Sequence, residues 1–71
     1  HWKVIMEKIN LVIKIARQYE GEYIFINVLK AFKDKDKLQE FVRTHEFERA
    51  EEINKVQCVC ELGIIEDVEV E

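Results

Sequence analysis

The segment from residue 53 to residue 70 constrains the fold most, because an apolar stripe runs through a glycine into an alternating stretch. Four apolar residues of the first part recur every third position, a spacing that places them on one face of a helix: Ile53, Val56, Val59 and Leu62. Gly63 follows at once, and glycine in a left-handed conformation commonly ends helices. The pattern therefore predicts a helix that ends at Gly63 with a positive φ angle.

The orientation of that helix makes its two cysteines distinguishable. Cys60 falls on the apolar stripe with Val56 and Val59 and is expected to be buried, whereas Cys58 is expected to be exposed. Alternation over 56–62 also permits a strand there, although the Glu-rich run over 46–55 favours a helix. After the glycine, period-two alternation predicts a strand over 64–70.

An apolar ridge that ends in Leu62-Gly63-Ile64-Ile65 and leads into a strand resembles the last helix and wing of the winged helix-turn-helix superfamily. The resemblance covers 23–70 and specifies no subfamily. It implies a mainly α fold, a small winged-helix-like domain of three to four helices with a short C-terminal β strand or truncated wing. Winged helices bind nucleic acid in some proteins and other proteins elsewhere, so the resemblance implies a fold more than a function.

The N-terminal region over 2–19 is interpreted as an amphipathic helix with two apolar stripes. The broad stripe consists of Trp2, Ile5, Met6, Ile9, Val12, Ile13 and Ala16. The second stripe lies nearly opposite, with Lys8 at its margin, and is made of Val4, Leu11 and Ile15. Because a surface helix needs one apolar face, the second stripe predicts contact with a partner or a second copy. Isolated apolar residues are also common on surfaces, which leaves an alternative.

The middle of the chain is expected to supply the first two helices of a helix-turn-helix core over 23–62. The stretch 23–33 is apolar on all sides and is interpreted as a buried helix, although 23–26 could begin as a strand. A second helix is expected over 36–44, with Asp36 as its cap and His45 near its end. The third helix is expected over 48–62, and one continuous helix over 36–62 is the alternative.

Composition bounds the class of protein. The chain has 71 residues, 48% hydrophobic and 37% charged, which fits one small globular domain. Its longest apolar run is far shorter than a membrane span, so a cytoplasmic protein without membrane contact is expected. His1 at the start suggests a fragment of a longer protein, and the lack of Ser and Pro beside abundant Ile, Lys and Glu resembles a thermophile's composition.

Charge argues against nucleic acid as the main partner. Residues 1–43 carry nine Lys or Arg against six Asp or Glu, whereas residues 44–71 carry two against nine. A DNA-reading helix over 48–62 would then present carboxylates to phosphates, which it should repel. If nucleic acid were bound, the candidate contacts would be Lys30, Lys33, Lys35, Lys37, Arg43, Arg49, Asn54 and Lys55.

The sequence therefore predicts a non-enzymatic protein-interaction or assembly domain of winged-helix type, which dimerises or docks through its N-terminal helix. No convergent acid–base set, phosphate loop or metal-ligand spacing is visible, so no catalytic residue, cofactor or metal is expected. A DNA-binding transcriptional regulator of helix-turn-helix type is the alternative. A small viral or mobile-element inhibitor or accessory protein is a second one.

Overall fold

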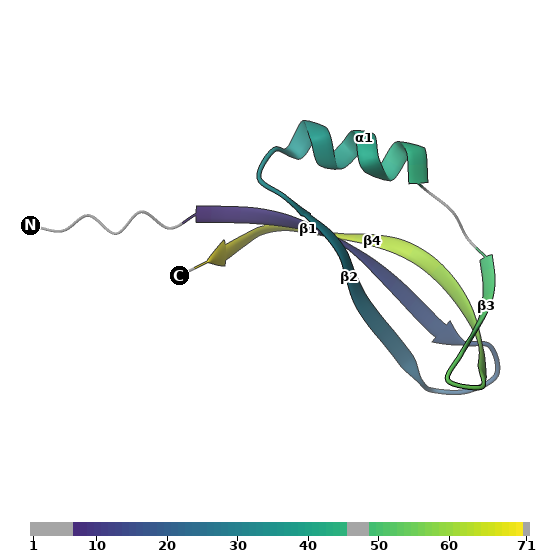
Figure 1. Cartoon of the computed structure of the whole chain (residues 1–71). Coiled ribbons are helices and arrows are strands. Elements are labelled where there is room, and N and C mark those ends of the chain that lie inside the picture. Colours follow the sequence, from purple (N-terminus) through teal and green to yellow (C-terminus); the bar gives the residue numbers. More distant parts are fainter. Residues whose placement is uncertain (1–6, 46–48, 71) are drawn as a thin grey trace, which may run out of the picture.

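The computed structural model describes residues 7–45 and 49–70, which form one antiparallel sheet of four strands and one helix (Figure 1). Along the chain the elements are β1 (Glu7–Gln18), β2 (Ile24–Phe32), α1 (Lys35–His45), β3 (Arg49–Ile53) and β4 (Val56–Val70). Their order across the sheet is β2-β1-β4-β3, and the sheet is curled into a half-barrel. The long strands β1 and β4 lie in the middle and pair with each other along nearly their whole length.

The winged-helix prediction is wrong, because the chain is mainly β. The helix expected over 2–19 is strand β1 in its described part, and the buried helix expected over 23–33 is strand β2. The third helix, and with it the continuous helix over 36–62, is replaced by the hairpin of β3 and β4. The helix expected over 36–44 is present as α1 and is the one helix among the described residues.

Strands form here because β-branched residues recur along β1 and β2. β1 contains Ile9, Val12, Ile13 and Ile15, whose side chains fit a pleated sheet and lose rotamer freedom in a helix. In a central strand both faces are apolar, so the strict alternation that marks a half-buried strand is absent. That is why the apolar spacing of β1 also matches a helical period.

The two-residue turn between β3 and β4 completes the second hairpin. Ile53 pairs with Val56, and the intervening Asn54 and Lys55 have φ angles of 51° and 64°. Two consecutive positive φ angles define the type I′ turn, whose twist matches that of the flanking strands. The helix expected through this region is excluded by the turn.

The hairpin also changes the environment of the last apolar stripe. Gly63 lies inside β4 rather than at a helix end, and no described glycine has a positive φ angle. Cys58 and Cys60 are both buried, because residues two apart in a strand share a face. The predicted exposure of Cys58 is therefore wrong, and Val56 and Val59 are half-buried rather than buried. The strand expected over 64–70 is the second half of β4.

Helix α1 covers one face of the sheet, which we call the inner face. Asp34 caps the helix: its side chain accepts a hydrogen bond from the Asp36 backbone N–H at 2.8 Å, so Asp34 takes the role predicted for Asp36. Leu38 is 1% exposed, and the ring of Phe41 contacts that of Phe32 with centroids 5.5 Å apart. Farther along the inner face the core consists of Ala16, Cys58 and Cys60 with Phe25, Ile53 and Val56 packed around them.

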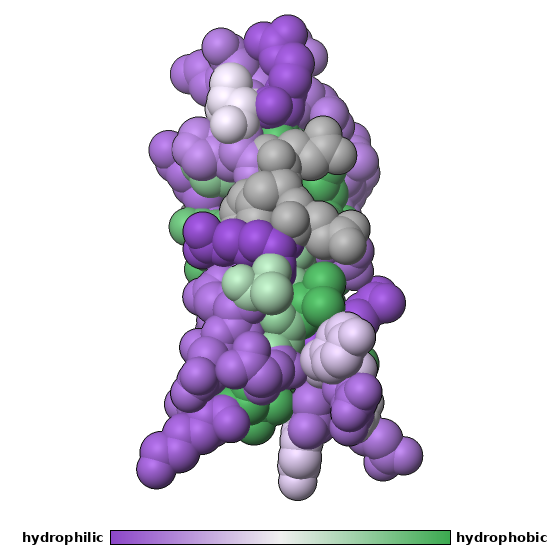
Figure 2. Space-filling view, turned by 90° about the vertical axis from the view of Figure 1, so that its right-hand side faces the viewer, coloured by the Kyte–Doolittle hydropathy of each residue, from purple (hydrophilic) through white to green (hydrophobic). Residues whose placement is uncertain are grey.

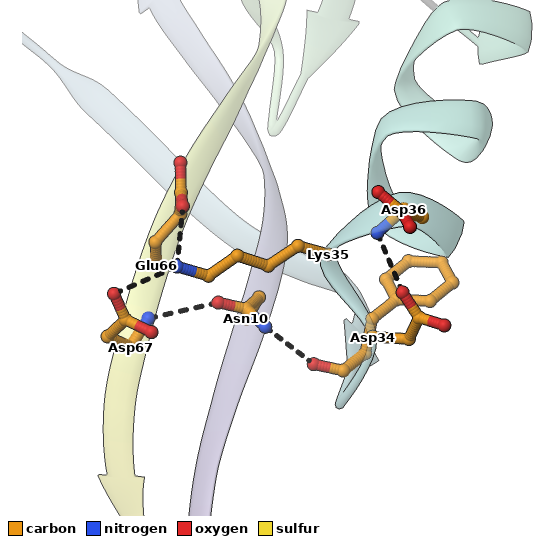
Figure 3. Close-up of polar contacts among 7 residues, drawn as sticks. Asn10, Asp34, Lys35, Asp36, Glu66 and Asp67 are labelled. Carbon is orange, nitrogen blue, oxygen red and sulfur yellow. Dashed lines mark hydrogen bonds and ion pairs between the residues drawn. The ribbon is translucent and has the colours of Figure 1, made fainter.

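Asn10 connects strands β2 and β4 close to the start of the helix (Figure 3). Its side chain is 2% exposed, donates to the Phe32 carbonyl at 3.2 Å and accepts from the Asp67 N–H at 3.0 Å. Asp67 has a φ angle of 57° and lies where the register between β1 and β4 shifts, so Asn10 satisfies the backbone of a β-bulge. Lys35, at the start of α1, pairs with Glu66 at 3.3 Å and with Asp67 at 3.1 Å.

We predict that Asn10→Ala lowers the free energy of unfolding by about 2 kcal/mol, because two backbone groups lose their buried partner. Urea unfolding followed by circular dichroism measures this change. The control is Asn27→Ala on the edge strand β2, where the side chain is exposed and the expected change is within about 0.5 kcal/mol. Equal effects of the two substitutions would contradict the role assigned to Asn10.

Candidate protein-interaction surface

The face of the sheet opposite α1, which we call the outer face, is apolar across three strands. Residues that pair directly in an antiparallel sheet point to the same side, so the register identifies its members. Ile13 pairs with Val28 on β2 and with Gly63 on β4, and Ile15 pairs with Ile26. The apolar residues assigned to it are Ile9, Leu11, Ile13 and Ile15 of β1, Ile24, Ile26, Val28 and Ala31 of β2, and Val59, Ile65, Val68 and Val70 of β4.

Gly63 forms the centre of this face. A Cβ atom at this position would lie 3.0 Å from the Cδ1 atom of Ile15 and 3.1 Å from the Cγ1 atom of Ile13. The two isoleucines therefore lean across the glycine and fill the space that a side chain would occupy. This packing explains why Ile13 is only 6% exposed although it lies on the uncovered side of the sheet. Gly63, which the sequence indicated as a helix end, instead leaves room for the side chains of Ile13 and Ile15.

The edge of the outer face is strongly exposed. Ile24, Ile26 and Val28 are 60%, 61% and 60% exposed, and Ile65 on the opposite side is 45% exposed. The largest contiguous apolar surface of a small protein is often an interaction site. By contrast, hydrophilic side chains cover most of the side of the molecule that carries the end of α1 and β3, with hydrophobic residues visible between them (Figure 2).

Among the described residues of β1, β2 and β4 that pair on the outer face, charges lie at its two ends. Glu7, which pairs with Val70, lies at one end, and Arg17 lies at the other. Arg17 pairs with Ile24 in register, and its guanidinium lies 3.0 Å from the carboxylate of Glu61. Both side chains are substantially exposed, so this ion pair contributes little to stability. The pair of Arg17 and Glu61 marks the end of the apolar surface near the β1–β2 connection.

Two of the four residues predicted to contact a partner lie on this surface. Leu11 and Ile15 are half-buried members of the outer face, on either side of Ile13. Lys8 is exposed and pairs with Glu69. It precedes Ile9 by one residue, so its side chain points away from the outer face. Val4 lies outside the described residues. The predicted helical stripe is thus a strand face, and the prediction that it meets a partner stays a prediction.

The sequence interpretation missed the β2 part of the surface. Ile24, Ile26 and Val28 alternate with Phe25 and Asn27, a period-two signal typical of a strand. The surrounding apolar residues obscured that signal, because Leu29 occupies a register shift between β1 and β2 and interrupts the alternation.

The residues proposed as nucleic-acid contacts do not converge on one helix. Lys30 belongs to β2, Lys33 to the connection between β2 and α1, Lys35, Lys37 and Arg43 to α1, Arg49 to β3, and Asn54 and Lys55 to the turn that follows. Several already face carboxylates or rings: Lys33 lies 3.5 Å from Glu7, and Lys30 lies over the rings of Phe32 and Phe41. The reading helix that the DNA argument assumed is absent from residues 49–70.

A second cluster of polar groups lies on the inner face beside the cysteines. The ammonium of Lys14 donates to the Glu51 carboxylate at 2.8 Å, and Arg49 lies 3.3 Å from the other oxygen of Glu51. The hydrogen bond from Lys14 lowers the pKa of Glu51, while burial and the neighbouring carboxylate raise the pKa of the Cys60 thiol. A buried thiol with a raised pKa is a poor nucleophile.

Comparisons of the chain with protein families, with characterised proteins and with solved structures found no match. Within residues 7–45 and 49–70, no group of three or more His, Cys, Asp or Glu side chains is arranged to hold a metal ion. Along the same residues, no helix has the length and apolar character needed to cross a bilayer.

We predict that the pair of Lys14 and Glu51 makes stability fall in acid. Because the folded pKa of Glu51 lies below its ordinary value of 4.5, its contribution is present above that value and is lost as pH falls through the folded pKa. Urea midpoints measured from neutral pH downward should therefore decline less steeply below about pH 4.5 for Glu51→Gln than for the wild type.

The matched control is Glu20→Gln, in the exposed connection between β1 and β2. It removes one carboxylate of the same type and should leave the wild-type slope unchanged. Identical slopes in the wild type and Glu51→Gln would show that the pair with Lys14 does not couple folding to pH.

Proposed function

We propose that this chain is a non-enzymatic protein-interaction domain that assembles through the outer face of its sheet. The exposure of Ile24, Ile26 and Val28 beside the packed centre at Ile13 is the observation that carries the proposal. Because each of these side chains is about three-fifths exposed, its burial in an apolar contact contributes roughly 1–2 kcal/mol. A partner that covers three of them therefore gains enough free energy to offset part of the entropy lost on association.

The architecture supports an assembly role. Domains usually contain two packed layers around one core. Among the described elements, α1 is the one that packs on the sheet as a second layer, and it lies on the inner face. The Cα atoms extend only 14 Å along the shortest principal axis, a thickness that matches a sheet with partial cover on one side. A protein bound on the outer face would complete a second layer there.

Catalysis is not proposed, because the chain's two thiols, Cys58 and Cys60, are buried in the core. Nucleic-acid binding is the weaker alternative, because Lys33 and Lys35 already pair with carboxylates and phosphate binding would compete with those contacts. A role as a viral or mobile-element accessory protein would use the same apolar surface.

A site-specific photo-crosslinking experiment tests the proposal in the cells that naturally make the protein. A benzophenone amino acid replaces Ile26 on the outer face, and in a matched variant it replaces Lys37 on the exposed side of α1. We expect a crosslinked protein adduct from position 26 and little or none from position 37. An absence of adducts at position 26, or equal adducts at both positions, would contradict the proposal.

A further inference from the structure

We propose that the occupant of the outer face is a second copy of this chain, so that two sheets stack through their outer faces about a two-fold axis. This inference rests on the proposed function and names its partner. It follows from three properties of the face: its area, its uncharged centre, and its contrast with the rest of the surface.

The area lies at the lower limit for a specific dimer. Ile24, Ile26 and Val28 are about three-fifths exposed and Ile65 is nearly half exposed, so these four side chains present on the order of 400 Å² of apolar surface. The half-buried Leu11 and Ile15 raise the exposed apolar area of the face to on the order of 500 Å². Two copies that cover this surface bury on the order of 1,000 Å² in total, near the smallest area of a specific protein–protein interface.

The distribution of charge favours a copy over a foreign partner. The chain carries a formal net charge of −4, so two copies repel each other wherever their charged surfaces meet. The apolar centre around Ile13 and Gly63 carries no charge, and the charges at its two ends are paired within each copy, Arg17 with Glu61 and Lys33 with Glu7. A two-fold contact brings the same patch onto itself, which an uncharged apolar face tolerates and a face of one sign does not.

The centre of the outer face, around Ile13 and Gly63, provides no charged group that would select a different protein. Electrostatic complementarity usually gives heterologous partners their specificity and register. Homodimer interfaces are instead more apolar than the average surface. The outer face, rich in Ile and Val and free of charge from Ile9 to Ile15 on β1, matches the second description.

The test measures the mass of the purified full chain by sedimentation velocity at micromolar concentrations. We expect a species of twice the 8.5 kDa chain mass. Ile26→Lys places a charge in the contact and should weaken dimerisation about 100-fold or more. Asn27→Lys is the matched control: it adds the same charge to the next residue of β2, which is also exposed but points to the inner face, and the dimer should persist.

Circular dichroism and urea unfolding of both variants verify that each retains the fold, since Ile26 and Asn27 are both exposed in the single chain. A wild type that stays monomeric up to about 100 μM, well above common dimer affinities, would overturn the second copy as occupant. A dimer that dissociates with Asn27→Lys but not with Ile26→Lys would overturn it as well.

The two proposals fail in different ways. A monomeric wild type whose position 26 crosslinks to a different protein removes the dimer and leaves the interaction domain. A wild type that is monomeric and yields no adduct at position 26 removes both. Adducts of twice the chain mass at position 26 support both together.

Discussion

The pairing of β1 with β2 on one side and β4 on the other is the constraint from which the other features follow. Because β1 is paired on both edges from Leu11 to Arg17, the register assigns each of these side chains to a face. Val12 and Ala16 point inward with the cysteines of β4, while Leu11, Ile13 and Ile15 point outward. A slip of one residue would exchange the two sets, and Asn10 opposes it by bonding both neighbouring strands.

The two faces of β1 differ in what covers them. The inner residues are nearly inaccessible because α1 and the β3–β4 hairpin pack over them, so this half resembles the core of any small domain. The outer residues are covered by neighbouring side chains only where Gly63 permits it. A chain of this size buries a modest apolar area by itself, and closure of the outer face by a second copy would add to its stability.

Local signals in the sequence predicted the parts of the fold that depend on local interactions. The polar run that contains Asp34 and Asp36 precedes an amphipathic stretch, and a helix is present there as α1. The alternation after Gly63 indicated a strand, which the structure extends back to Val56. Leu11 and Ile15, which are apolar in excess of one stripe, led to the prediction of a partner surface. Both residues lie on the outer face, and the partner itself stays a prediction.

The remaining elements depend on contacts between distant residues. Apolar residues on both faces of β1 match a helical period as well as a two-sided strand, and only pairing with β2 and β4 distinguishes them. The turn at Asn54 and Lys55 lacks the glycine that usually marks a type I′ hairpin. No turn was therefore visible in the sequence, and the Glu-rich stretch before it was interpreted as a helix. Gly63 is required by Ile13 and Ile15, which lie nearly fifty residues away in sequence and were not visible as its neighbours.

Nuclear Overhauser contacts from the methyl groups of Ile13 test the central position of β1 most directly. The structure predicts contacts to the Hα atoms of Gly63 and to the methyl groups of Val28, since Ile13 pairs with both residues. Both contacts should appear together in the uniformly labelled wild type. Contacts confined to Ile9 and Ala16, which adjoin Ile13 only on a helix face, would contradict the sheet and with it the outer face.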